Sequence, residues 1–140
     1  DLHTDNRYAQ VFNFINASLE DYITRFKLDC DRLEISSSWT NHSLPNSGQN
    51  HKFHRHSMSL LSGIYYFTGG ASLGFEDPMT PRVMNQLEVL RFDYAPFEFI
   101  DPLPGKLVLF PSWLYHYTIP NPSLKRVTLS FNTYHKTLDK

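Results

Sequence analysis

The chain is poor in cysteine and in long apolar runs. The first shortage restricts disulfide formation, and the second restricts insertion into a membrane. Cys30 is the only cysteine among 140 residues, so no disulfide can form within the chain and a reducing, cytoplasmic location is expected. No apolar run approaches the roughly 20 residues that cross a bilayer, and no signal peptide is visible, so we expect no membrane partner. The first residue is Asp1 rather than Met, which leaves a trimmed N-terminus open.

The sequence also lacks an excess of either positive or negative charge. The 13 Lys and Arg residues face 14 Asp and Glu residues, which leaves a formal net charge of −1 with histidine neutral. Because proteins that bind nucleic acids usually present a basic surface, we expect no nucleic-acid partner. No internal repeat, low-complexity tract or linker appears, and the length suits one domain over residues 1–140.

One segment near the start has the spacing of an amphipathic helix. Asp5 or Asn6 can cap its beginning, and apolar residues then recur at three- and four-residue steps. They are Tyr8, Val11, Ile15, Leu19, Tyr22, Ile23 and Phe26. We therefore expect a helix over about residues 6–28, with its apolar stripe packed on a sheet.

The rest of the chain alternates short apolar runs with turn residues, which is typical of β structure. Aromatic residues make up 15% of the sequence, and many of them fall in such runs. The expected strands are 33–39, 60–67, 71–75, 87–92, 97–100, 107–110 and 126–133, with a further alternating run at 51–56. Residues 40–50 and 77–85 are expected as loops and 134–140 as a tail. Roughly eight to nine short strands at even spacing favour an antiparallel sandwich or barrel.

A polar row occupies one face of the last expected strand. Because side chains alternate along a strand, Arg126, Thr128, Ser130 and Asn132 share a face. Such a row needs partners in the interior or must face water.

Histidines supply a second pattern. His51, His54 and His56 fall within six residues, and on a strand His54 and His56 would point the same way. An H-x-H pair suits a divalent metal, and His116, which follows a buried run, is the natural third ligand. With Arg126 as the anchor of an anionic co-substrate, these residues indicate a metal pocket. The alternative is a hydrated histidine patch, with an Arg on the sheet edge.

Three segments resemble the Fe(II)/2-oxoglutarate-dependent oxygenases. They are HRHSMSLLSGIYYF at 54–67, GKLVLFPSWLYH at 105–116 and R-x-T at 126–128. The chain is more narrowly similar to a branch of these oxygenases that is common in marine phages and bacteria and related to prolyl 4-hydroxylases. The resemblance covers about residues 38–134, and its most specific part is the ten-position spacing between the last His and the Arg.

The resemblance implies a fold and an activity. The fold would be mainly β: a double-stranded β-helix, which is a jelly-roll or cupin-like barrel, over about residues 33–134 with the N-terminal helix packed on it. The activity would be a dioxygenase that uses Fe(II), O2 and the small-molecule co-substrate 2-oxoglutarate to hydroxylate a primary substrate, either a peptide or a small molecule. The substrate stays open, with a prolyl or other aminoacyl side chain among the choices. If a phage encodes the chain, the expected location is the host cytoplasm.

The resemblance also implies roles for particular residues. His54 and His116 match the metal-binding histidines. Arg126 matches the arginine that holds the far carboxylate of 2-oxoglutarate, and Thr128 stands where many members have a Ser that assists. Tyr66 matches a tyrosine that bonds the same carboxylate.

One metal-binding position departs from the family pattern, because His56 stands where an Asp or Glu is usual. His56 can be the third ligand, which is the interpretation we favour. Alternatively Glu76 or Asp77 enters the site, or the metal keeps only two protein ligands. Glu76 and Asp77 also suit the start of a turn before Pro78.

Two other functions fit parts of the pattern. A cupin-type three-histidine metalloprotein that does not use 2-oxoglutarate would explain the histidines but not Arg126 and Thr128. A non-catalytic β-sandwich, such as a phage structural or adhesion module, would explain the strands alone. Trp39, Trp113 and Tyr115 either form an apolar rim for a substrate or pack under the barrel ends.

Overall fold

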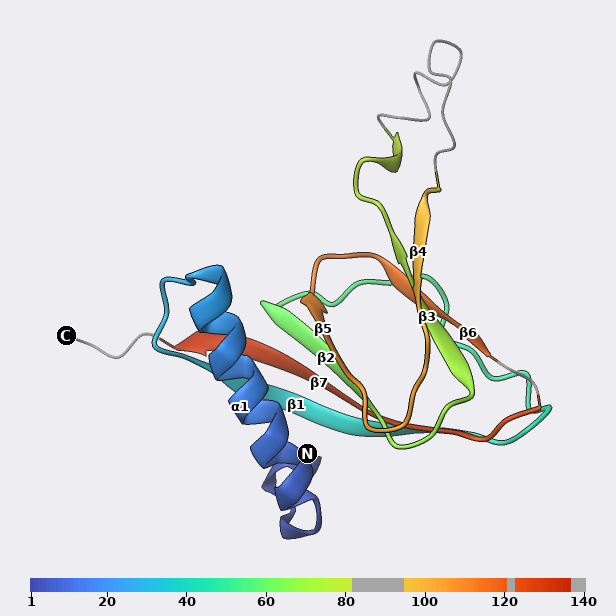
Figure 1. The fold of residues 1–140 in the computed structure, drawn as a ribbon, viewed down its shortest axis with the longest axis horizontal. Coiled ribbons are helices and arrows are strands. Elements are labelled where there is room, and N and C mark those ends of the chain that lie inside the picture. The colour runs from blue at the N-terminus through green and yellow to red at the C-terminus, as the bar shows by residue number, and fades with distance from the viewer. Residues whose placement is uncertain (82–94, 121–122, 137–140) are drawn as a thin grey trace.

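The computed structural model describes residues 1–81, 95–120 and 123–136 (Figure 1). Two short 3-10 turns, Leu2–Thr4 and Asn6–Tyr8, lead into α1, which spans Ala9–Phe26. The described residues then form seven strands. They are β1 (Arg32–Ser43), β2 (Leu61–Tyr66), β3 (Ala71–Glu76), β4 (Phe97–Ile100), β5 (Leu107–Pro111), β6 (His116–Pro120) and β7 (Arg126–Lys136).

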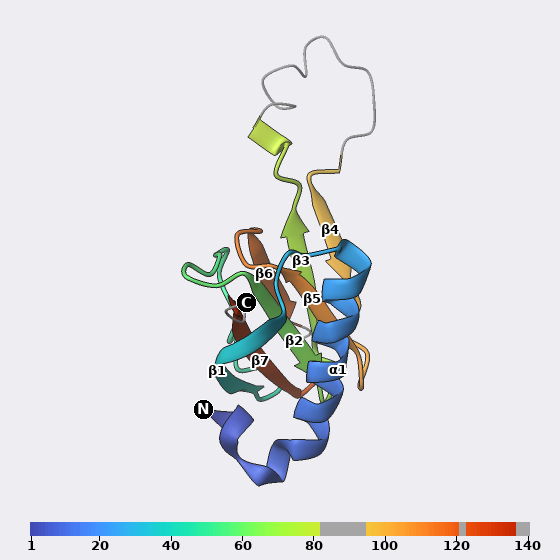
Figure 2. The same cartoon turned by 90° about the vertical axis from the view of Figure 1, so that its left-hand side faces the viewer.

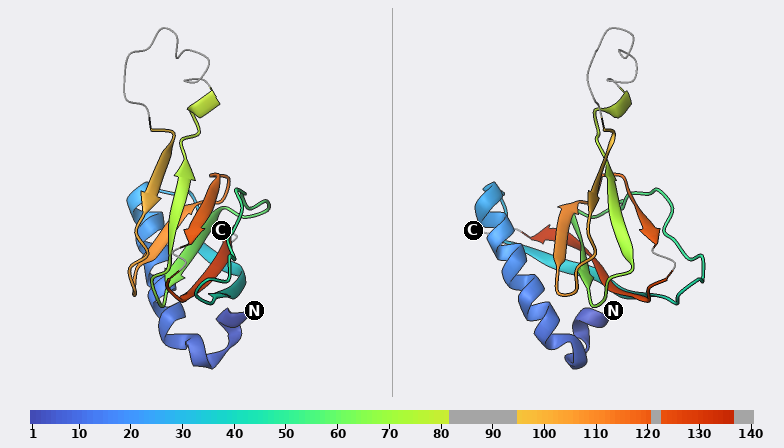
Figure 3. Two further views of the ribbon diagram at one scale, coloured as in Figure 1. Left: turned by 90° about the vertical axis from the view of Figure 1, so that its right-hand side faces the viewer. Right: turned by 45° about the vertical axis from the view of Figure 1, so that its right-hand side comes forward.

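The strands form two antiparallel sheets. One sheet has the order β1-β7-β2-β5 and the other β4-β3-β6, so strands distant along the chain lie side by side. α1 lies along the outer face of the four-stranded sheet, and the three-stranded sheet lies on the opposite side (Figures 1 and 2). Figure 3 shows these layers from two further sides. The expected mainly β class with a packed N-terminal helix is confirmed.

α1 buries the stripe that its spacing predicts. Phe12, Ile15 and Leu19 are the buried residues of the helix, and they form one core with Leu129 and Phe131 of β7. Burying a large apolar side chain of this kind contributes about 1.5–3 kcal/mol, so the packed face outweighs helix propensity in holding α1. Within the described residues, no helix combines the length and the apolar character needed to span a bilayer.

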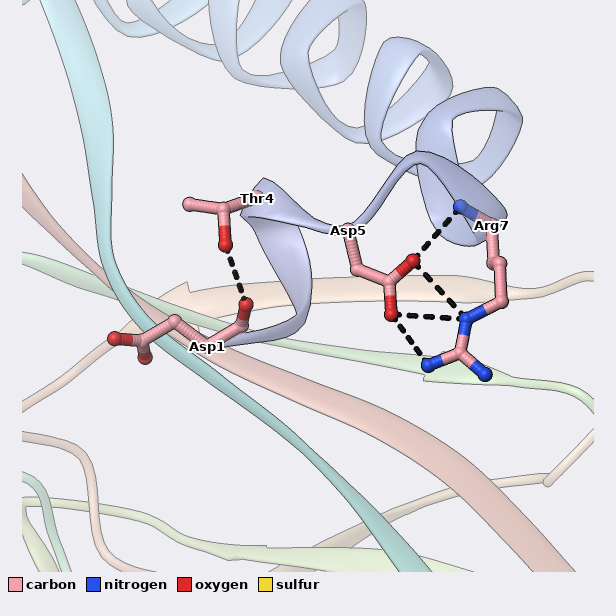
Figure 4. Close-up of polar contacts among 4 residues, drawn as sticks. All are labelled: Asp1, Thr4, Asp5 and Arg7. Atoms are coloured by element: carbon pink, nitrogen blue, oxygen red, sulfur yellow. Dashed lines mark hydrogen bonds and ion pairs between the residues drawn. The ribbon is translucent and has the colours of Figure 1, made fainter.

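The ends of the helical segment differ slightly from the expected ones. Asp5 accepts a hydrogen bond from the backbone N–H of Arg7 at 3.0 Å and pairs with its guanidinium (Figure 4). It therefore caps the short turn Asn6–Tyr8, which runs directly into α1. At the other end Lys27 adopts the left-handed conformation with a φ of 49°, which ends the helix two residues before position 28.

The two faces of β7 carry different chemistry. Leu129 and Phe131 pack toward α1, whereas the alternate residues belong to the face between the two sheets. A second core lies between the sheets, formed by Ile64, Tyr66, Leu73 and Phe110. The polar row of β7 therefore lies in the interior beside this core and does not face water.

Long-range pairing extends two strands beyond their expected ends. β1 continues through residues 40–43, which we expected as the start of a loop, because it pairs with β7 until Ser43 lies opposite Arg126. β7 in turn continues to Lys136, where we expected a tail, because Lys136 lies opposite Arg32. Neither extension has a signal in the local sequence, since the partner strand decides it.

Two further expectations about strands were wrong. His116–Pro120 forms β6, where we expected no strand, because these residues pair with β3. Residues 51–56 contain one isolated bridge, between His54 and His116, and no strand. The expected strand at 87–92 lies outside the described residues.

Candidate metal centre

Backbone contacts bring three histidines together from distant parts of the chain. His116 begins β6 and exchanges two hydrogen bonds with the backbone of His54, each 3.0 Å long. The N–H of His56 donates to the carbonyl oxygen of Ser112 at 2.9 Å, just after β5 ends. The H-x-H segment is thus held beside His116 from two sides, although it is not itself a strand.

The three imidazole rings converge. The ring centroids of His54 and His116 lie 4.3 Å apart, and the centroid of His56 lies 5.1 Å from each of them. One ring nitrogen from each residue lies within 4.8 Å of the others. Nitrogen ligands bind a divalent metal at about 2.0–2.1 Å, so a modest closing of the rings lets all three reach one ion. The donor set therefore fits a metal that prefers imidazole, such as iron or zinc.

Two of the rings are oriented by carbonyl oxygens. The Nδ1 atom of His54 lies 2.6 Å from the carbonyl oxygen of Lys52, and that of His116 lies 3.0 Å from the carbonyl oxygen of Leu114. Because a carbonyl oxygen can only accept, Nδ1 carries the proton in both rings. Each Nε2 therefore keeps its lone pair, which is how metal-binding histidines are usually prepared.

Burial keeps the site in the protonation state that a metal needs. His116 is only 3% exposed, and burial lowers its pKa to about 4, with the neighbouring histidines acting in the same direction. Burial also lowers the pKa of His56, and the nearby His54 adds to the effect. Neutral imidazole is the form that coordinates, so His116 and His56 are ready ligands at neutral pH.

Two hydrogen-bond donors lie in the interior without a protein partner. Arg126 is 2% exposed and Tyr66 is fully buried, yet no described residue bonds Nε of Arg126 or the hydroxyl of Tyr66. Burial raises the pKa of Tyr66 to about 12, although the charge of Arg126 opposes the shift, so this hydroxyl stays protonated and can donate. A buried donor without a hydrogen bond costs about 1–3 kcal/mol of folding free energy, and more when it is charged. An anion placed here would accept hydrogen bonds from both side chains.

The polar row of β7 has partners in the interior. The side-chain amide of Asn41 on β1 donates to the hydroxyl of Ser130 at 2.9 Å and lies 3.4 Å from that of Thr128. Asn132 accepts from the hydroxyl of Ser62 at 2.8 Å. Thr128 is fully buried near Arg126 along the same face.

The carboxylates considered as metal ligands do not join the histidines. Glu76 lines a separate outer pocket together with Arg55, Trp113 and Tyr115. The side chain of Asp77 accepts from the N–H of Met79 at 2.8 Å, which is the turn-starting arrangement that the sequence suggested. Among the described residues, the group that could hold a metal consists of histidines alone.

The cavity beside the three histidines has lining residues that the sequence did not assign. His51 and Thr118 line it, as does Trp39, whereas the other two predicted rim residues belong to the outer pocket. Thr118 was missed because we expected no strand at 116–120. Its signal was the H-x-T alternation of His116 and Thr118, which puts both side chains on the same face of β6.

Comparison with known proteins agrees with this geometry. Residues 37–132 match the protein family described as "Putative 2OG-Fe(II) oxygenase". A search of curated proteins returned no match.

Two solved structures share the fold. A 2OG-Fe(II) oxygenase family oxidoreductase from Burkholderia pseudomallei is 12% identical, with a TM-score of 0.63 over 97% of this chain and 57% of the other. A prolyl-4-hydroxylase from Pseudomonas putida is 17% identical, with a TM-score of 0.57 over 89% of this chain and 64% of the other. The chain thus spans less than two thirds of either structure. These likenesses confirm the double-stranded β-helix expected from the sequence.

Proposed function

Because the chain belongs to the 2OG-Fe(II) oxygenase family, we propose that it is a non-haem Fe(II) dioxygenase that couples oxidative decarboxylation of 2-oxoglutarate to hydroxylation of a substrate. The observation that carries the proposal is that the Tyr66 hydroxyl and Nε of Arg126 have no hydrogen-bond partner among the described residues and lie in the same interior as the three histidines. 2-Oxoglutarate has a 2-oxo acid at one end and a second carboxylate at the other. It therefore suits a site with a metal at one end and a buried cation at the other.

His54, His56 and His116 would hold the iron, which when bound supplies the activation of O2. The carbonyl contacts of two rings leave Nε2 directed away from the backbone, so little reorganisation is needed for binding. Arg126 and Tyr66 would grip the far carboxylate and fix how the co-substrate lies. The apolar side chains of Ile64 and Phe110, which also line the cavity, would keep water from the reacting end.

We also propose that the substrate is a prolyl or other aminoacyl side chain, in a peptide or as a small molecule. Support comes from the fold shared with the Pseudomonas putida prolyl-4-hydroxylase and from Trp39, which lines the cavity with an aromatic surface. The near-balanced charge of the chain supports a peptide or small molecule over a nucleic acid.

The test is turnover of 2-oxoglutarate without a primary substrate. Purified protein is incubated with Fe(II), ascorbate, O2 and 2-oxoglutarate, and succinate is measured. Slow succinate formation is expected in the wild type, and none with His116→Ala, which removes the most buried ring of the set. His135→Ala, at an exposed histidine near the end of β7, is the matched control. Stoichiometric iron without any succinate would favour the cupin-type alternative, and failure to bind a divalent metal would favour a non-catalytic module.

A further inference from the structure

A fourth histidine lines the same cavity as the three-histidine set. His51 is half-buried there, beside Thr118. Its ring centroid lies 6.2 Å from that of His54, and it does not belong to the group whose nitrogens come within 4.8 Å of one another. His51 is therefore near the predicted metal ligands but is not placed to share their ion.

Hydrogen bonds hold His51 beside Thr118, which also contacts Arg126. The N–H of His51 donates to Oγ1 of Thr118 at 2.9 Å, and the N–H of Thr118 donates to the carbonyl oxygen of His51 at 3.1 Å. The same Oγ1 lies 3.5 Å from the guanidinium of Arg126. After burial, the charge of Arg126 is the largest influence that lowers the pKa of His51, which makes the two groups electrostatic neighbours.

The side chains of Thr118 and His51 each keep a hydrogen-bond donor for a further acceptor. Oγ1 of Thr118 already receives two N–H groups, so its own proton must be directed to another atom. The described residues provide no hydrogen bond to the ring of His51, whose neutral imidazole carries one N–H. With the partnerless atoms of Tyr66 and Arg126, four side chains offer donors at this end of the interior.

We propose that His51 and Thr118 complete the pocket for the distal carboxylate of 2-oxoglutarate. His51 donates to the carboxylate from its ring, and Thr118 positions His51 because its Oγ1 and its N–H both hydrogen-bond the backbone of His51. The inference rests on the proposed function and deepens it, because it assigns to His51 the selection of a diacid over a 2-oxo acid with a single carboxylate.

The test compares two ligands on Co(II)-loaded protein by calorimetry. 2-Oxoglutarate has the distal carboxylate, and 2-oxobutyrate keeps the metal-binding end but lacks it. His51→Leu is expected to weaken 2-oxoglutarate binding by about tenfold and to leave the affinities for 2-oxobutyrate and Co(II) unchanged. His51→Gln, which keeps an N–H donor, should retain most of the affinity. His135→Leu is the matched control, and Thr118→Val, which keeps the side-chain volume, is a second variant expected to weaken 2-oxoglutarate selectively.

The outcomes separate this inference from the proposed function. Equal 2-oxoglutarate affinity in wild type and in folded His51→Leu or Thr118→Val would overturn the inference and leave the proposed function standing. Loss of Co(II) binding in His51→Leu would also overturn it, since His51 would then be a metal ligand. If wild-type Co(II) protein binds neither 2-oxo acid, the proposed function fails and the inference falls with it.

Discussion

Arg126 is charged and almost completely buried, and within the described protein its guanidinium reaches only a weak contact with Thr118. A buried cation in this condition is destabilising unless an anion joins it. The natural explanation is that Arg126 binds an anionic ligand. Tyr66, whose buried hydroxyl has no hydrogen-bond partner among the described residues, belongs to the same arrangement.

Replacing Arg126 by Ala should weaken 2-oxoglutarate binding by about ten- to a hundredfold, because a charge-assisted pair contributes roughly 1.5–3 kcal/mol. The measurement is a titration of the Co(II)-loaded protein, with metal affinity measured separately and expected to be unchanged. The affinity of Arg126→Lys for 2-oxoglutarate should fall between those of the wild type and Arg126→Ala. An ammonium keeps the charge but cannot form the two parallel hydrogen bonds of the planar guanidinium. An unchanged dissociation constant in Arg126→Ala would remove this residue from the co-substrate site.

At the scale of elements, a single bridge between His54 and His116 joins the H-x-H segment to β6. Outside the sheet, the ring of Phe53 stacks on that of Tyr115, with centroids 4.9 Å apart and an interplanar angle of 2°. Each stacked residue directly precedes a bridged histidine, so the stack supports the bridge from the opposite side. The placement of the His54 ring beside the His116 ring thus depends on this bridge and on the stacked rings next to it.

The junction of β2 and β7 depends on the lack of a side chain at Gly63. A Cβ atom built there would lie 2.2 Å from the ring of Phe131, which is fully buried against α1 and cannot move aside. Gly63→Ala should therefore destabilise the protein by about 1–3 kcal/mol in urea unfolding. In the Gly63→Ala background, Phe131→Leu should cost less than it does alone, because the smaller side chain makes room. Additive costs in this double-mutant cycle would show that the predicted clash does not occur.

At the scale of the whole molecule, burial of neutral histidines links stability to pH. The pKa of His116 is about 4 in the folded protein and about 6.5 when the ring is exposed on unfolding. The unfolded chain therefore binds more protons between these values, so stability is complete above pH 6.5 and is lost as the pH falls toward 4. Burial of His56 acts in the same direction.

Metal-free protein should accordingly lose about 2 kcal/mol of unfolding free energy between pH 7.5 and pH 5 from His116 alone. Urea unfolding at several pH values measures this dependence, and His116→Gln should flatten it. A slope that persists unchanged in the variant would mean that other groups carry the pH dependence.

The sequence alone determined the parts of this protein that depend on local spacing. The three- and four-residue apolar steps of α1 predict its buried face because a helix repeats every 3.6 residues. Strand alternation put Arg126, Thr128 and Ser130 on one face, and the H-x-H pair with His116 marked the candidate metal centre before any fold was known. The family resemblance then connected these residues to one fold.

Only the tertiary structure decided which residues meet. Whether His56 or a carboxylate stands with the other histidines depends on where β3 places Glu76, and no local pattern contains that information. The strand after His116 exists because β3 pairs with it, and through it Thr118 and His51 come to line the cavity. Burial of the Arg126 charge is likewise a product of two sheets that enclose it, since long-range packing sets solvent exposure and sequence neighbours do not.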